Sequence, residues 1–193
     1  MAINMYIKRI PSSDIYLIKP QIYKDDRGFF MEVFHEKKFI EFGIHHTFVQ
    51  ENRAGSRQGV LRGLHYQIKH AQGKLIQVLL GEVFDVSVDL RRSSPMFGKP
   101  FCLKLSAESK WQLWIPPGFA HGYYVLSEWA EVAYKATDFY APELERTLLW
   151  NDPALGIEWP LLDKQAPILS TKDEQGKMLA ESDTYEELDR TSV

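Results

Sequence analysis

Two histidines in this sequence have surroundings that suit a proton-transfer group. His65 lies in GVLRGLHYQ, residues 59–67, and His121 lies in PPGFAHG, residues 116–122, and neither belongs to a charged surface run. Histidine titrates near neutral pH, so it can remove a proton from a substrate under physiological conditions. A lone histidine is more often a hydrogen-bonded structural residue, so a catalytic role depends on its neighbours.

Arg62 is an unusual neighbour because it lies in a segment that otherwise reads as a buried strand. Desolvating an unpaired guanidinium is costly, which predicts that this segment lines a cavity open to an anionic partner. Side chains alternate along a regular strand, so Arg62 and His65 would point to opposite faces. They share one cavity only if Gly63 allows a bulge or Arg62 reaches round an edge.

Four further residues have both a structural and a chemical interpretation. Lys74 could simply solvate a loop, Tyr134 and Tyr140 could be core or rim aromatics, and Asp173 could be a helix N-cap or turn residue. Alternatively, a phenol can donate a proton inside a dry pocket, and a carboxylate can orient a histidine. The remaining histidines lie in polar contexts, and we expect them at the surface: His35, His45, His46 and His70.

The elements that would position these residues are mainly strands. Short apolar or alternating runs separated by Gly, Pro, Asp and Ser predict an antiparallel β-sandwich or barrel, the jelly roll included. Residues 83–90 alternate between an apolar and a polar face, with Asp85, Ser87 and Asp89 on the polar one. The segment FHEKKFIEFG, residues 34–43, predicts one short helix that ends at Gly43, and residues 174–193 form a helical or mobile tail.

Length and composition indicate one globular domain over residues 1–193. The chain is 45% hydrophobic with a net charge of −3, which favours neither nucleic acid nor an anionic membrane as a partner. It has no apolar run long enough to cross a bilayer, and its single cysteine excludes an internal disulfide, so we expect a cytoplasmic protein. The glycine-rich dinucleotide loop and the phosphate-binding P-loop are both missing from the sequence.

Six motifs taken together resemble the dTDP-4-dehydrorhamnose 3,5-epimerase family. Their order and spacing match from about residue 16 to residue 173, which is more specific than any one motif. They are DDRGFFMEVF, FVQENRAGSRQGVLRGLHYQ, GEVFDVSVDLRRSSPMFG, WIPPGFAHGYYVLSE, YKATDFYAPELERTLLWNDPALGIEWP and LSTKD.

The resemblance implies an all-β, cupin-type jelly roll with a few short helices. Residues 59–81 and 116–121 match the two cupin motifs. Metal-binding cupins have two histidines around one residue and then a glutamate, whereas here Tyr66 and Gln67 follow His65 and Lys74 stands at the glutamate position. A protonated lysine is a poor metal ligand, so we expect no metal and no cofactor.

The implied substrate is dTDP-4-dehydro-6-deoxy-glucose, whose C4 ketone acidifies the protons on C3 and C5. By match to the family motifs, His65 would be the base, Tyr134 the proton donor and Asp173 the carboxylate that orients His65. Lys74 would lie near the C4 oxygen and stabilise the enolate.

The resemblance also implies a set of residues around the sugar and the nucleotide diphosphate. The family's homodimers exchange extended strands, so that some N-terminal binding residues would serve the partner's site. Separately from the resemblance, the place of Asp85 on the polar face of its strand leads us to expect that it holds His121 in one tautomer. The implied binding residues are Arg27, Glu32, Gln50, Asn52, Arg62, His121, Tyr140, Glu145 and Lys172.

Three other functions remain open at this level. The nearest is a relative that inverts only one centre, or a ketoisomerase acting on another dTDP-keto sugar. A non-catalytic cupin that binds a nucleotide sugar is less favoured because base, donor and lysine are all present. A metal-dependent cupin oxygenase is disfavoured by Gln67 and Lys74.

Overall fold

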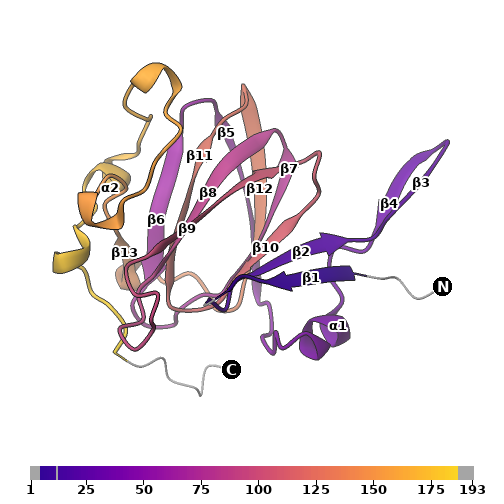
Figure 1. Ribbon diagram of the computed structural model, residues 1–193, viewed down its shortest axis with the longest axis horizontal. Helices are drawn as coiled ribbons and strands as arrows, with labels where there is room; N and C mark the ends of the chain where they lie inside the picture. The colour runs from indigo at the N-terminus through magenta and orange to yellow at the C-terminus, as the bar shows by residue number, and fades with distance from the viewer. Residues whose placement is uncertain (1–4, 12, 187–193) are drawn as a thin grey trace.

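Two antiparallel sheets form the body of the molecule in the computed structural model, which describes residues 5–11 and 13–186 (Figure 1). The six-stranded sheet has the spatial order β1 (Met5–Arg9), β2 (Tyr16–Pro20), β10 (Gln112–Ile115), β7 (Lys74–Leu80), β12 (Trp129–Ala136) and β5 (Gln50–Arg57). The five-stranded sheet has the order β13 (Glu145–Thr147), β6 (Leu61–Gln67), β11 (Phe119–Val125), β8 (Glu82–Asp89) and β9 (Pro100–Ser106). The predicted all-β jelly roll is confirmed.

A separate hairpin projects from this body at the upper right of Figure 1. It consists of β3 (Ile22–Asp25) and β4 (Gly28–Met31), which pair only with each other among the described strands. Phe29 and Phe30 are more than half exposed on this hairpin. We call residues 22–31 the arm.

The interior between the two sheets is apolar at one end and polar at the other. Ile76 and Val78 of β7 pack against Val83 of β8 and Val125 of β11 in the main core cluster. Burying such side chains is the dominant favourable contribution to folding. The polar end of the same interior holds the site described below.

Both faces of β8 are buried. Alternation of apolar and polar residues along a strand usually indicates one buried face and one face exposed to solvent, so the burial of the polar face is a difference from that expectation. Val86 and Val88 pack outward against Leu148 and Tyr185, because the chain after β13 covers the outer face of the five-stranded sheet. Asp85 is on the inward side and is 1% exposed. The polar face of this strand therefore lines the barrel interior.

Helices are few and short. The predicted helix is α1 (Glu36–Glu41), and Gly43 follows it with φ +87°, a conformation that glycine adopts without strain. The second helix is α2 (Thr171–Glu174). No helix in the described parts of the chain has the length and apolarity needed to cross a membrane. The single-turn 3-10 helices are η1 (Pro142–Leu144), η2 (Pro153–Leu155), η3 (Leu162–Lys164) and η4 (Leu179–Glu181).

The expected helical or mobile tail, residues 174–193, is described only as far as residue 186. Within that part, η4 is the one helical turn beyond α2, and the backbone of Tyr185 hydrogen-bonds Leu90 and Arg92 beside β8. Residues 187–193 lie outside the described part of the chain.

Two of the four histidines expected at the surface are not fully exposed. His45 and His70 are exposed as predicted, but His35 and His46 are half-buried. The ring of His46 lies 5.2 Å from that of Trp114, measured between centroids. His46 therefore packs against an aromatic ring instead of lying free at the surface.

Candidate active site

A bulge in β6 brings Arg62 and His65 to the same face of the strand. His65 lies opposite His121 on β11, and Arg62 lies opposite Tyr123, so three residue steps on β6 match two on β11. Because His121 and Tyr123 are two residues apart on β11, they share a face, and so do their partners. One of the two geometries expected from the sequence is therefore confirmed.

Gly63 makes this bulge sterically feasible. Its φ is +124°, and a Cβ atom there would lie 2.5 Å from the Cα of Gly122 on the neighbouring strand. Only glycine combines this backbone conformation with so close an approach. Arg62 is exposed at the mouth, where its Nε donates to Ser56 Oγ at 2.9 Å.

His65 is joined to Asp173 by one short hydrogen bond. The Nε2 atom of His65 lies 2.5 Å from Oδ1 of Asp173, whose side chain is 3% exposed. Asp173 is not the N-cap of α2 but its third residue, because Ser170 occupies the N-cap and its Oγ accepts from the backbone N–H of Asp173. The same hydroxyl donates to Oδ2 of Asp173 at 2.7 Å. Both carboxylate oxygens are thus fixed.

The electrostatics of this pair favour a neutral imidazole beside a carboxylate. Burial lowers the pKa of His65, and the charges of Lys172 and Lys74 act in the same direction, although the hydrogen bond to Asp173 opposes them. Burial alone would raise the pKa of Asp173, but the hydrogen bonds from His65 and Ser170 hold it below its ordinary value. With Nε2 donating to Asp173, the lone pair on Nδ1 is free to accept a proton.

Lys74 and Tyr134 come from neighbouring strands of the other sheet. The Nζ atom of Lys74 lies 6.0 Å from the ring centroid of Tyr134 and 3.5 Å from the carbonyl oxygen of His65. Burial lowers the pKa of Lys74 to about 8, against the opposing charges of Glu145 and Asp85. Burial, assisted by Glu145, raises the pKa of Tyr134, so this phenol is protonated at neutral pH.

A second histidine–carboxylate pair lies deeper in the interior. Asp85 Oδ2 lies 2.8 Å from Nε2 of His121, as expected from the sequence, and both residues are buried. The other carboxylate oxygen of Asp85 has no partner among the described residues. A buried acceptor of this kind can bind a substrate hydroxyl.

Glu145 organises the rim of the site. Its Oε2 accepts from the Tyr140 hydroxyl at 2.8 Å, and its Oε1 pairs with Lys172 Nζ at 2.8 Å. Burial would raise the pKa of Glu145, but the hydrogen bonds from Lys172 and Tyr140 lower it. The hydrogen bond to Glu145 in turn raises the pKa of Tyr140. Gln50 joins the rim because its Oε1 accepts from the Tyr140 backbone N–H at 2.9 Å, while its Nε2 donates to Asn52.

Two residues expected at the site are not brought to it within this chain. Arg27 lies on the projecting arm, where it pairs with Asp25, and its side chain is 90% exposed. Glu32 lies at the foot of the arm and pairs with Lys38 at 2.7 Å. Among the described residues, neither side chain has a hydrogen bond or ion pair with the two histidine–carboxylate pairs.

Ser170 is the functional residue that sequence reasoning missed. The signal was present, because a serine followed three residues later by an acidic residue is typical of a helix N-terminus with reciprocal capping. In this protein the acidic residue of that motif turns away from the backbone and towards His65. The capping motif and the His65–Asp173 pair therefore share one carboxylate.

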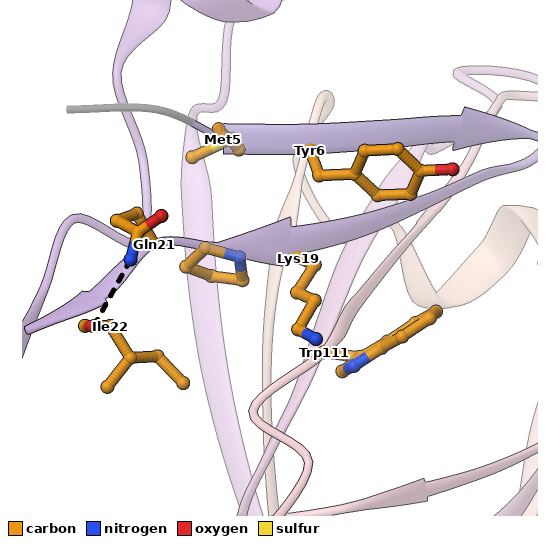
Figure 2. Close-up of a pocket in the computed structure, with 7 residues that line it drawn as sticks. Met5, Tyr6, Lys19, Gln21, Ile22 and Trp111 are labelled. Carbon is orange, nitrogen blue, oxygen red and sulfur yellow. Dashed lines mark hydrogen bonds between the residues drawn. The ribbon is translucent and has the colours of Figure 1, made fainter. Parts of the chain in front are cut away.

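A depression elsewhere on the described surface lacks this combination of groups. Figure 2 shows one of about 640 Å³ near the foot of the arm, where Lys19 lies beside Trp111 and Tyr6 is exposed. Its described lining contains no histidine or carboxylate that could exchange a proton. Across residues 5–11 and 13–186, no group of three or more His, Cys, Asp or Glu side chains is arranged to hold a metal ion.

Comparison with known proteins gives a consistent family assignment. The family model described as dTDP-4-dehydrorhamnose 3,5-epimerase matches residues 9–181. The enzyme of that name from Pseudomonas aeruginosa is 56% identical over 182 residues, which cover 94% of this chain and 99% of the relative.

Two solved structures extend the similarity to three dimensions. A dTDP-6-deoxy-D-glucose-3,5-epimerase from Legionella pneumophila, in complex with dTDP-4-keto-L-rhamnose, is 51% identical with a TM-score of 0.88, covering 92% of this chain and 94% of that one. The dTDP-4-dehydrorhamnose 3,5-epimerase from Bacillus anthracis, with TDP and PPi bound, is 41% identical with a TM-score of 0.87, covering 91% and 99%. This chain therefore belongs to the dTDP-4-dehydrorhamnose 3,5-epimerase family.

Proposed function

We propose that this epimerase converts dTDP-4-dehydro-6-deoxy-glucose to dTDP-4-dehydro-rhamnose by inverting C3 and C5 through enolate intermediates, without a cofactor. The observation that carries the proposal is the pairing of His65 with Asp173 beside Lys74 and Tyr134. It supplies a neutral base, an orienting carboxylate, a cation and a protonated phenol around one opening. These are the groups that deprotonation and reprotonation next to a ketone require.

Each inversion needs a proton removed from one face of the ring and returned on the other. Nδ1 of His65 takes the proton from carbon, and Asp173 stabilises the imidazolium that forms. The electrons move onto the C4 oxygen, where the ammonium of Lys74 stabilises the enolate more than the ketone. Tyr134, on the opposite sheet, returns a proton to the carbon from the other face.

The remaining residues bind the nucleotide and the sugar. Arginine suits a diphosphate because its planar fork donates to two oxygens at once, which is the role proposed for Arg62 and for Arg27. The other proposed contacts to the sugar and nucleotide are Glu32, Gln50, Asn52, His121, Tyr140, Glu145 and Lys172. The relatives that hold dTDP-4-keto-L-rhamnose or TDP support a dTDP-sugar as the ligand class.

We also propose a cytoplasmic homodimer in which the arm of one subunit reaches the site of the other. The support is that Arg27 lies on an exposed, projecting hairpin with two exposed phenylalanines rather than at the site of its own chain. An exposed apolar surface of this kind is typical of an interface. We treat residues 1–193 as one epimerase domain.

The decisive experiment follows deuterium. The purified protein is incubated with dTDP-4-dehydro-6-deoxy-glucose in heavy water, and proton NMR monitors C3 and C5, with a reductase trapping the product. The expected result is exchange at both carbons and a rhamnose product. Exchange at one carbon would instead support a single-centre epimerase, the activity of a 34% identical 3'-monoepimerase from Streptomyces bikiniensis. Absence of exchange at both carbons in folded protein would overturn the proposal.

A further inference from the structure

Gln67 forms hydrogen bonds through both ends of its buried side-chain amide. It lies two residues after His65 at the end of β6 and is 3% exposed. Its Nε2 donates to the carbonyl oxygen of His70 at 2.8 Å and to that of Phe139 at 3.2 Å, and its Oε1 accepts from the backbone N–H of Ala141 at 2.7 Å. Both donor hydrogens and the acceptor are therefore in use.

These bonds fix the orientation of the amide. Reversing it would place the oxygen against two carbonyls and the NH₂ group against the N–H of Ala141. Each reversed contact would leave a buried polar group without a partner, at a cost comparable to a lost hydrogen bond. Gln67 therefore has one arrangement, and that arrangement holds two backbone positions that flank Tyr140.

The segment held in this way is residues 137–141, which continues from β12 and carries Tyr140 to the rim. Its aromatic rings contribute little packing, because Phe139 is 64% exposed and Tyr140 is 49% exposed. The segment is irregular, and its position depends on hydrogen bonds to its backbone and to Thr137. Among the described side chains that bond its backbone, Gln67 alone is fully buried, whereas Gln50, Gln72 and Asp138 are half-buried.

The same strand connects this contact to the rim carboxylate. Gln67 lies directly opposite Glu145 in the pairing of β6 with β13, and Glu145 accepts from the Tyr140 hydroxyl. Gln67 therefore holds the backbone on both sides of Tyr140, and Glu145, which lies opposite Gln67, binds the Tyr140 hydroxyl. A shift of the segment would break both attachments.

We propose that Gln67 is a positioning residue that holds residues 137–141, and with them Tyr140, in the geometry that binds the sugar nucleotide. Gln67 stands where a metal-binding cupin motif has its second histidine, and in this protein the residue at that position holds the segment that carries Tyr140. The inference rests on the proposed function for its kinetic readout. Its structural readout is independent of turnover.

The test compares Gln67→Met with Gln72→Met. Methionine keeps the length of glutamine but forms none of its hydrogen bonds, and Gln72 contributes one bond, at 2.8 Å, to the carbonyl of Asp138 in the same segment. We expect Gln67→Met to speed hydrogen exchange of residues 137–141 by about tenfold and to raise the KM by about tenfold, with kcat changed less than about threefold. The Gln72→Met control should change each quantity less than about threefold.

Unchanged exchange in folded Gln67→Met would overturn the proposal, and so would faster exchange without a higher KM. If Gln67→Met does not fold, Gln67→Glu replaces it, because that variant keeps the acceptor for Ala141 and loses the donors to the two carbonyls. The same two criteria then apply. If the wild-type protein shows no turnover, the proposed function fails, and the affinity for dTDP measured by calorimetry takes the place of KM in judging Gln67.

Discussion

The carboxylate of Asp173 meets the imidazole of His65 at 2.5 Å, although 108 residues separate them in the chain. The contact depends on two local structural features. The bulge at Gly63 turns His65 inward, and the N-cap residue Ser170 fixes Asp173 by a hydrogen bond. The contact sets which nitrogen of the imidazole is free. The pair, built from two distant segments, is the acid–base unit of the proposed mechanism.

Asp173→Asn should leave the fold intact and lower kcat by about 10³- to 10⁴-fold, because an amide can hold the imidazole in the wrong tautomer and cannot stabilise its cation. Steady-state assays of the dTDP-sugar turnover measure this. Glu174→Gln, at the next and exposed position, is the matched control and should retain activity. Comparable activity in Asp173→Asn and wild type would remove Asp173 from the mechanism.

Ser170→Ala should lower kcat by about tenfold and move the acid limb of the pH–rate profile to higher pH. Loss of the hydroxyl removes a hydrogen bond that stabilises the Asp173 carboxylate, so the His65–Asp173 pair takes up a proton more readily. Ser170→Thr keeps a hydroxyl and should restore both. A Ser170→Ala enzyme that is less stable but has an unshifted profile would reduce Ser170 to a helix cap.

Activity should have an acid limb below pH 6.5 and an alkaline limb near pH 8. The first follows from the lowered pKa of the base His65, and the second from the pKa of about 8 for Lys74, which must be charged to stabilise the enolate. Measuring kcat/KM from pH 5 to 10 checks both. Lys74→Arg stays protonated throughout, so any activity it retains should lack the alkaline limb.

Stability provides an independent check on Lys74. Its folded pKa of about 8 lies below the ordinary value of 10.5, so the unfolded chain binds more protons over that interval and wild-type stability rises with pH through it. Lys74→Met should therefore be inactive yet more stable than wild type by about 1 to 3 kcal/mol at pH 7, with the gain shrinking above pH 8. Urea unfolding at pH 7 and pH 10 measures the difference. A Lys74→Met protein that is less stable than wild type would contradict the inference that burying the Lys74 ammonium lowers the free energy of unfolding.

Tyr134→Phe should still exchange substrate protons with heavy water while forming little inverted product. The base His65 acts without the phenol, but the proton on the opposite face is not returned efficiently. Deuterium incorporation and product formation are measured in the same NMR time course. Tyr6→Phe, at an exposed tyrosine on β1, is the control. Full inversion by Tyr134→Phe would assign the donor role elsewhere.

Much of the fold was predictable from sequence because turns and alternation are local signals. The burial of both faces of β8 was not predictable, since it depends on residues 148–185 covering its apolar face. The sequence around Gly63 is compatible with two geometries, and the register of β6 against β11 shows that the bulge is the one adopted. The roles of Arg27 and Glu32 were implied by resemblance alone, and the position of the arm separates both from the site of their own chain.

Mixing two inactive variants tests whether Arg27 serves the partner's site. Consider a heterodimer of an Arg27→Ala subunit and a His65→Ala subunit in which Arg27 acts across the interface. The site in the Arg27→Ala subunit has its own intact His65 and receives an intact Arg27 from the partner, so it works. The site in the His65→Ala subunit carries both defects. Random pairing makes about half of all dimers heterodimers, so co-expression should restore about a quarter of wild-type activity. If Arg27 acts within its own chain, every site carries one defect and activity stays at the level of the separate variants. Heterodimers isolated through differently tagged subunits should have about half of wild-type activity if Arg27 acts across the interface, because one of their two sites works, and should stay inactive if it acts within its own chain.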